Sequence, residues 1–419
     1  MSHNSQEEPD GTDLKRRDLP LSGTGVATAL TATKPAPSQN NQHLEQPFLE
    51  QAPQPGKGSS DISAYKALTN EKSIRIINLR DLETNAREIL PPYSFAYISG
   101  GAGDEWTMRE NEAAFNRWVI DPNYLTGIRS CDLTTRVFDS ELSLPVITAP
   151  MGGQGIAHAL KEIPNVKGTH KAGTLYVNTS VSHLSMEEIA AGSPGPKWFQ
   201  IYFPANRDYA RELLQRATAS GFSAIVITVD STIFSNRERP IRLGVPAPGL
   251  GAGNGVKTPG IDPQTAMELK MDLNWNDIAF CQKETGLPVI IKGVLTPALA
   301  NEAVKRGCAG VWVSNHGGRA LDNTAPTIAV LPRIADAVSG KAVIIIDGGI
   351  RRGQDVFRAL ALGADVTAIG RPLLYGMALG GAQGVQAVYT HLKTELHMVM
   401  QLAGTPDIKS ITRQYVSML

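Results

Sequence analysis

Short apolar runs alternate with amphipathic stretches along the chain from about residue 144 onward. Such runs are typical of buried parallel strands, and they lie at 144–148, 174–178, 197–201, 224–229, 288–291, 309–313, 342–346 and 365–369. Apolar positions at helical spacing lie between them, for example at 208–220, 298–306 and 353–362. These eight runs, each followed by a helix or crossover, predict an α/β fold that closes as a (β/α)8 TIM barrel.

An open, doubly wound sheet is the alternative for alternating strands and helices. Such a sheet would carry a Gly-x-Gly-x-x-Gly turn after its first strand. The chain has Met151-Gly152-Gly153-Gln154-Gly155 there, so the pattern favours the closed barrel.

Two segments interrupt the alternation. Residues 74–139 precede the barrel, and we expect them to be largely helical. Residues 240–271 are rich in Gly and Pro and join the fourth strand to the fifth. Because long loops are usually functional or mobile, we expect this one to be a lid over the active site.

The first 62 residues differ from the rest, since they are rich in Ser, Thr, Pro, Gln and Asn. This composition predicts a disordered tail, followed by one catalytic domain over 63–419. Within the tail, Lys15-Arg16-Arg17-Asp18-Leu19-Pro20-Leu21 resembles a degenerate twin-arginine export signal. Pro20 and the poor apolar stretch favour a plain basic patch instead. We therefore expect a cytoplasmic location, with export to the periplasm as the alternative.

The composition limits the classes of partner. The 419 residues are 42% hydrophobic, which is enough for one large α/β domain. The formal net charge of zero gives no electrostatic reason to expect nucleic acid. No run of eighteen apolar residues predicts a membrane span. The three cysteines lie far apart and form no Cys-x-x-Cys pair, so neither a metal site nor a disulfide framework is predicted.

Polar residues and glycines follow every predicted strand, whereas the strand bodies are apolar. In a β/α barrel the C-terminal ends of the strands, here called the mouth, carry the chemistry. The sixth strand is followed by Ser314-Asn315-His316-Gly317-Gly318-Arg319, which offers a general base and a carboxylate binder three residues apart. The other strand ends carry Ala149-Pro150-Met151-Gly152, Thr179, Gln200, Tyr202, Thr228, Asp230, Lys292, Asp347 and Gly370.

The turns after the seventh and eighth strands predict a phosphate site. Gly349 with Arg351, and Gly370 with Arg371, each combine an approachable backbone, a helix start and a positive charge. Ordinary glycine turns with surface arginines are the alternative. Lys292 ends an apolar strand, where it either neutralises a negative cofactor or forms a Schiff base, as in barrel aldolases.

Three further polar residues point to the kind of cofactor. Thr179, Gln200 and Thr228 offer the mixed donors and acceptors that a heteroaromatic ring needs. Together with Lys292 and the phosphate site, they suggest flavin mononucleotide (FMN).

At this point the residues resemble a family, the FMN-dependent α-hydroxy-acid oxidases and dehydrogenases. The resemblance runs from about Ile74 to about Val416. It rests on Tyr97-Ile98-Ser99-Gly100, Gly103-Asp104-Glu105-Trp106-Thr107, Phe199-Gln200-Ile201-Tyr202, Thr228-Val229-Asp230 with Arg237, Lys292-Gly293, the His316 segment, Asp347-Gly348-Gly349-Ile350-Arg351-Arg352-Gly353 and Gly370-Arg371-Pro372. Residues 103–107, 198–202 and 378–381 are most similar to the L-lactate oxidase branch.

The resemblance implies a role for each site residue. His316 would be the general base, with Asp230 holding the imidazole and raising its pKa. Arg237 and Arg319 would bind the substrate carboxylate, and Tyr97 and Tyr202 would hydrogen-bond the substrate. The implied FMN contacts are Ala149, Pro150, Met151, Gly152, Thr179, Gln200, Thr228, Lys292, Ser314, Asp347, Gly349, Arg351, Gly370 and Arg371.

The implied reaction is oxidation of an (S)-2-hydroxy acid, with L-lactate favoured, to the 2-keto acid while O2 becomes H2O2. The implied assembly is a homotetramer. A lactate monooxygenase and a dehydrogenase that avoids oxygen are alternatives within the family, because Gly152 stands where many oxidases of the family have alanine. Val181 stands where glycolate and lactate oxidases have a large aromatic residue, so we expect a wider pocket that admits longer or aromatic hydroxy acids. Outside it, a Schiff-base aldolase using Lys292 and a non-catalytic barrel that binds a phosphorylated ligand stay open.

Overall fold

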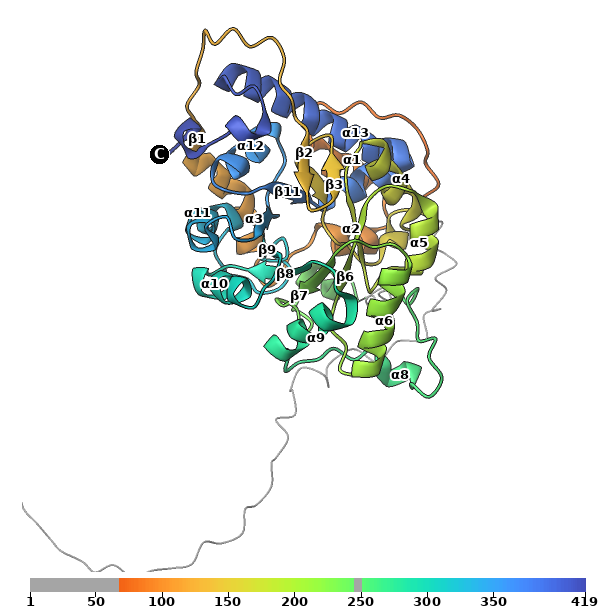
Figure 1. The fold of residues 1–419 in the computed structure, drawn as a ribbon. Helices are drawn as coiled ribbons and strands as arrows, with labels where there is room; N and C mark the ends of the chain where they lie inside the picture. The colour runs from red at the N-terminus through yellow and green to blue at the C-terminus, as the bar shows by residue number, and fades with distance from the viewer. Residues whose placement is uncertain (1–67, 245–250) are drawn as a thin grey trace, which may run out of the picture. The chain divides into compact units, whose positions relative to one another are not determined.

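The computed structural model describes residues 68–244 and 251–419 (Figure 1). The predicted tail, its export signal and residues 63–67 of the predicted catalytic domain lie outside these residues, as do positions 245–250 of the predicted lid. The fold described below is that of the two described stretches.

Eight parallel strands form the barrel in the order β4-β11-β10-β9-β8-β7-β6-β5. Each overlaps one predicted run, so the (β/α)8 prediction is confirmed. Their bounds are β4 (Val146–Thr148), β5 (Tyr176–Thr179), β6 (Lys197–Ile201), β7 (Ile225–Thr228), β8 (Val289–Val294), β9 (Gly310–Val313), β10 (Val343–Ile346) and β11 (Val366–Ile369). The ring closes between β4 and β5, where the Thr148 amide donates to the Leu175 carbonyl at 3.1 Å.

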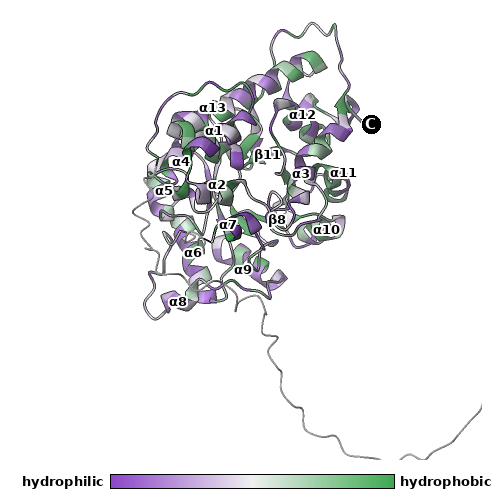
Figure 2. Ribbon diagram, turned by 180° about the vertical axis from the view of Figure 1, so that it is seen from behind, coloured by the Kyte–Doolittle hydropathy of each residue, from purple (hydrophilic) through white to green (hydrophobic). Residues whose placement is uncertain are grey.

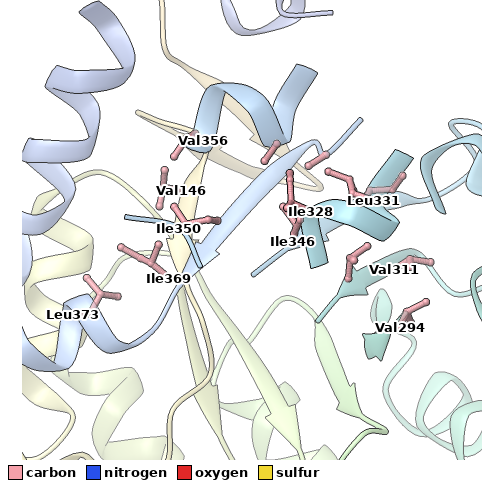
Figure 3. Packing of buried hydrophobic residues seen from close by; sticks show 14 of the residues in the cluster. Val146, Val294, Val311, Ile328, Leu331, Ile346, Ile350, Val356, Ile369 and Leu373 are labelled. Atoms are coloured by element: carbon pink, nitrogen blue, oxygen red, sulfur yellow. The ribbon is translucent and has the colours of Figure 1, made fainter. Parts of the chain in front are cut away.

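Strand residues alternate between two apolar layers. Ile147, Val177, Trp198, Val226 and Trp312 point inward and fill the barrel. The neighbouring residues point outward and pack under the helices. Figure 3 shows part of this outer layer, in which Val146, Ile346 and Ile369 of the strands gather with Ile328, Val356 and Leu373 of the helices.

A hairpin closes the end of the barrel opposite the mouth. It consists of β2 (Thr135–Val137) and β3 (Ser140–Leu142), which pair antiparallel. Val137 and Leu142 belong to the inner layer, and the Phe138 ring lies 5.5 Å from that of Trp198 near the start of β6. The hairpin therefore covers the end of the barrel opposite the mouth with apolar side chains.

Helices cover the outside of the barrel and are hydrophilic on one side and hydrophobic on the other (Figure 2). Those that follow the strands are α4 (Ile163–Lys171), α5 (Met186–Gly192), α6 (Arg207–Ala219), α7 (Glu238–Arg242), α8 (Pro263–Ala266), α9 (Trp275–Thr285), α10 (Pro297–Lys305), α11 (Thr327–Val338), α12 (Gly353–Ala361) and α13 (Arg371–Ala403). The last is kinked at Gly380 and Gly381. None of the helices in the described stretches has both the length and the apolar character that a membrane crossing needs.

The segment before the barrel is helical only as far as Arg117, where a short 3-10 turn (Ala114–Arg117) ends. It contains α1 (Asp81–Ile89), α2 (Pro92–Ser99) and α3 (Trp106–Ala113), but β1 (Trp118–Ile120) and the hairpin follow. The prediction of a largely helical 74–139 is therefore wrong beyond residue 117. The reason is long-range pairing, because β1 forms a ladder with the C-terminal β12 (Val416–Met418), which the local pattern does not reveal.

Part of the predicted lid is fixed to the body of the protein. Asn254 is 1% exposed, accepts from the Met186 amide at 2.9 Å and donates to Ser182 Oγ at 2.9 Å. Other parts of the segment, including Pro240, Ile241, Met267 and Leu269, line the cavity at the mouth. The lid function itself stays a proposal for the residues on either side of 245–250.

The packing of α4 on α13 gives a test of the fold. An added Cβ at Gly168 would lie 2.5 Å from the Ala382 carbonyl oxygen and 2.6 Å from Val385 Cβ. Because the backbone there cannot move away, we expect Gly168→Ala to lower the free energy of unfolding by about 1–3 kcal/mol despite its better helix propensity. Thermal denaturation measures this. Gly255→Ala is the control, since its nearest neighbour is 3.5 Å away; equal melting temperatures for the two variants would contradict the packing.

Candidate active site

A cavity of about 590 Å³ opens at the mouth of the barrel. A volume of this size suits a cofactor-sized ligand. Its polar wall consists of Tyr93, Tyr97, Tyr202, Ser231, Ser235, Arg237, Lys292, His316, Arg319, Asp347, Arg351 and Arg371. Its apolar and glycine wall includes Ala149, Pro150, Met151, Gly152, Ile156, Val181, Phe234, Gly349, Gly370 and Leu374. The cavity thus gathers residues from all parts of the barrel and from α2.

His316 and Asp230 form a hydrogen-bonded pair between the ends of β9 and β7. His316 Nδ1 lies 3.0 Å from Asp230 Oδ1, and Nε2 lies 3.2 Å from the Tyr202 hydroxyl. His316 has a φ of 60°, which is unusual for a residue with a side chain. The Ser314 hydroxyl accepts its backbone N–H at 3.0 Å and supports this turn. With Nδ1 held by the carboxylate, Nε2 is the nitrogen that faces the cavity as a base.

Opposing effects set the pKa of His316. Burial lowers it, Asp230 raises it, and the charges of Lys292 and Arg237 lower it again, so the net pKa is below the ordinary 6.5. The predicted effect of Asp230 is present, but burial outweighs it. The pKa of Asp230 is also lowered, because His316 and Lys292 offset the cost of its burial. The imidazole is therefore neutral, and able to accept a proton, at ordinary pH.

Two guanidinium groups stand beside this pair. Arg237 Nη1 lies 3.5 Å from the Tyr97 hydroxyl, and the Tyr97 ring lies 5.0 Å from the Arg319 guanidinium carbon. Burial and the charge of Arg237 lower the pKa of Arg319 to about 9. Arg319 donates only to carbonyl oxygens, those of Tyr97, Ile98 and Gly100, among the described residues. Two positive charges with no carboxylate partner predict that an anion binds between them.

Lys292 is buried in a second polar cluster. Its Nζ donates to Ser314 Oγ at 2.9 Å and lies 3.4 Å from Asp347 Oδ2. Ser314 in turn donates to Asp347 Oδ1 at 2.7 Å. Both Lys292 and Asp347 line the cavity, so a positive and a negative group face whatever occupies it.

The glycine turns form the far end of the cavity. Gly348 and Gly349 have φ values of 98° and 82°, which residues with side chains rarely adopt. Arg351 and Arg371 line the cavity beside the N-termini of α12 and α13. Arg351 pairs with Glu112 at 2.9 Å, whereas Arg371 donates to the carbonyl oxygens of Ile98, Gly317 and Gly100. The charge and the helix starts fit a phosphate group.

Thr179, Gln200 and Thr228 lie side by side at the ends of β5, β6 and β7. The Thr179 hydroxyl donates to Gln200 Oε1, and Gln200 Nε2 donates to Thr228 Oγ1 at 2.8 Å. All three are at most 3% exposed. They lie behind the cavity wall rather than in it, as do Ser314 and Asp230. The FMN contacts predicted for Thr179, Gln200, Thr228 and Ser314 stay predictions, as do the roles that the sequence analysis gave to the other site residues.

The structure adds lining residues that the sequence analysis did not name, three of them within the predicted lid. These are Tyr93, Ile156, Phe234, Ile241, Met267, Leu269 and Leu374. Most are apolar and come from α2 or from the segments flanking 245–250, outside the strand ends on which the prediction relied. Burial, and the negative charge of Tyr97 in its ionised form, raise the pKa of Tyr93 to about 12, so Tyr93 stays a neutral hydrogen-bond donor.

The fold and the site together define a class: a β/α-barrel enzyme whose cavity has a histidine–aspartate pair, two arginines beside it and a cationic end near the starts of α12 and α13. A family model described as FMN-dependent dehydrogenase matches residues 86–418. The L-lactate oxidase of Lentilactobacillus hilgardii is 42% identical over 362 residues, which cover 84% of this chain and 96% of that protein. The glycolate oxidase of Spinacia oleracea is 35% identical over 355 residues, covering 82% and 96%.

A solved structure agrees with these relatives. The protein from Pediococcus acidilactici described as a lactate oxidase superimposes with a TM-score of 0.80 and 40% identity, covering 85% of this chain and 98% of that one. The chain belongs to the FMN-dependent α-hydroxy-acid oxidase and dehydrogenase family. The predictions of this family and of FMN as the cofactor are confirmed. The cavity fits FMN, since its cationic end matches a phosphate and its middle carries Lys292.

The His316–Asp230 pair predicts a pH dependence. Only neutral His316 accepts a proton, so kcat/KM should rise with pH and level off with a midpoint below 6.5, because the pKa is lowered. Asp230→Asn removes the group that raises this pKa. In the Asp230→Asn variant, the midpoint of the kcat/KM profile should therefore move to still lower pH, and kcat should fall by about 10²-fold or more. Oxygen-uptake rates across pH measure both, with exposed Asp272→Asn as control. A midpoint that moves upward in Asp230→Asn would contradict the pairing.

Proposed function

We propose that this protein oxidises (S)-2-hydroxy acids, with L-lactate as the leading substrate, to 2-keto acids and reduces O2 to H2O2. The observation that carries the proposal is the His316–Asp230 pair beside Arg237 and Arg319, whose guanidinium groups have no carboxylate partner among the described residues. The similarity to L-lactate oxidases supports the substrate. FMN, when bound, accepts two electrons from the substrate and passes them to O2.

The residues divide the work according to their positions. Arg237 and Arg319 hold the substrate carboxylate, which fixes the substrate between them and His316. Tyr97 and Tyr202 donate hydrogen bonds to the substrate oxygens. Nε2 of His316 accepts a proton from the substrate, and Asp230 stabilises the imidazolium that results. Lys292 offers a positive charge where negative charge develops.

The aldolase alternative finds no support in the site. A Schiff-base lysine needs a free amine that a carbonyl can reach. Lys292 is instead held between Ser314 and Asp347, in a cavity that also carries a phosphate end. The family membership points the same way. A homotetramer remains a prediction from the family resemblance.

The general-base role gives the first test of the proposal. His316→Gln keeps a similar volume but cannot take up a proton at ordinary pH. We expect the variant to keep its FMN and its yellow colour while kcat for L-lactate falls by about 10²–10⁴-fold. FMN absorbance and oxygen uptake measure the two properties, and His391→Gln, on α13, is the control. Near-normal turnover in His316→Gln would remove the base assignment.

Gly152 and Val181 bear on the identity of the product. A Cβ at Gly152 would lie 2.7 Å from Val181 Cγ2, and both residues line the cavity. We expect Gly152→Ala to change the ratio of pyruvate with H2O2 to acetate with CO2, because the methyl group must push Val181 aside. Gly152→Ala with Val181→Ala relieves the contact and should bring the ratio back towards that of the parent. Product analysis tests this, and identical ratios in all three proteins would make the pair irrelevant to the product.

A further inference from the structure

A loop joins the two arginine-bearing segments of the site. Residues 100–105 run between α2 and α3. The Ala102 amide donates to the Gly318 carbonyl at 2.8 Å, next to Arg319, and the Gly103 amide donates to the Asn236 carbonyl at 3.0 Å, next to Arg237. The relative position of the two guanidinium groups therefore depends on this loop.

One ion pair ties the same loop to α7. Arg239 Nη2 donates to Glu105 Oε2, and Nη1 donates to Ser99 Oγ at 3.2 Å. Glu105 Oε1 accepts the Gly101 amide at 2.9 Å, so one carboxylate holds both the loop and the helix. The Glu105 side chain is 12% exposed and that of Arg239 is 40% exposed, so the pair is buried on the Glu105 side and reached by solvent on the other. α7 lies beside α2 (Figure 2).

The backbone conformation of Glu105 supports a structural role for this ion pair. Glu105 has a φ of 62°, a conformation that a residue with a side chain adopts at some cost. The cost is offset when the side chain makes contacts that another backbone conformation would lose.

We propose that the Glu105–Arg239 ion pair positions Arg237 and Tyr97 for the substrate carboxylate. Arg237 precedes α7, and Tyr97 lies on α2. A tie between the two helices holds the Arg237 guanidinium and the Tyr97 hydroxyl, now 3.5 Å apart, facing one point of the cavity. Neither Glu105 nor Arg239 lines the cavity, so both are positioning residues. The proposal rests on the proposed function, because it assumes that the cavity binds a carboxylate.

The test compares Arg239→Gln, Glu105→Gln and the double variant with an Arg242→Gln control. Arg242 lies on the same helix, is 77% exposed and pairs only with Glu238 among the described residues. Each variant is purified with FMN, and the dissociation constant of oxalate, a non-reacting carboxylate, is read from the FMN absorbance. KM and kcat for L-lactate are measured alongside.

We expect each single variant to raise the oxalate Kd and the lactate KM by about tenfold while kcat changes by no more than about twofold. The double variant should lose no more than either single one, because both remove the same contact. Arg242→Gln should match the parent. Additive losses, or an Arg239→Gln variant that behaves like the control, would overturn the proposal. If Arg239→Gln does not fold, Glu105→Gln tests the proposal by the same rise in the oxalate Kd and the lactate KM.

The oxalate measurement also separates this proposal from the proposed function. A parent protein that binds oxalate but does not oxidise any 2-hydroxy acid would contradict the function and leave the positioning test intact. A parent that oxidises L-lactate, with single variants whose oxalate Kd is unchanged, would contradict only the positioning role.

Discussion

An excess of positive charge at the barrel mouth is the constraint on which the site depends. Removing a cation from water is costly unless a partner compensates for it. Lys292 has Asp347, and Arg351 has Glu112. Among the described residues Arg319 donates to carbonyl oxygens alone, and Arg371 donates to carbonyl oxygens and the Met108 sulfur. Burial lowers the pKa of each. The two cationic regions of the cavity therefore favour anions, and under the proposed function these are the FMN phosphate and the substrate carboxylate.

The same constraint explains how the N-terminal segment attaches to the barrel. Arg319, in the loop after β9, and Arg371, the first residue of α13, both donate to the carbonyl oxygens of Ile98 and Gly100 at the C-terminal end of α2. A helix end with unpaired carbonyls is partially negative, so it suits two guanidinium groups. This attachment places Tyr97 over the mouth. Under the proposed function, Arg319 therefore both anchors α2 and binds the substrate carboxylate.

The sequence was most informative where local pattern decides the structure. The apolar bodies and polar ends of the strands predicted the barrel, its mouth and the gathering of His316, Lys292 and Arg371 there. Local pattern could not predict the pairing of β1 with β12, which joins residues about three hundred positions apart. It also could not show that Thr179, Gln200 and Thr228 bond to one another behind the wall. Nor could it weigh burial against Asp230 in setting the pKa of His316.

The central claim is that this cavity holds FMN, that a 2-hydroxy acid bound beside it gives two electrons to the flavin, and that His316 accepts a proton from the substrate. The most direct measurement is to mix L-lactate with the FMN-loaded protein in the absence of oxygen and follow the visible flavin absorbance. The account predicts that the absorbance bleaches and that one pyruvate forms per FMN, with a return of the colour when oxygen is admitted. An absorbance that stays unchanged with L-lactate and with longer (S)-2-hydroxy acids would contradict it.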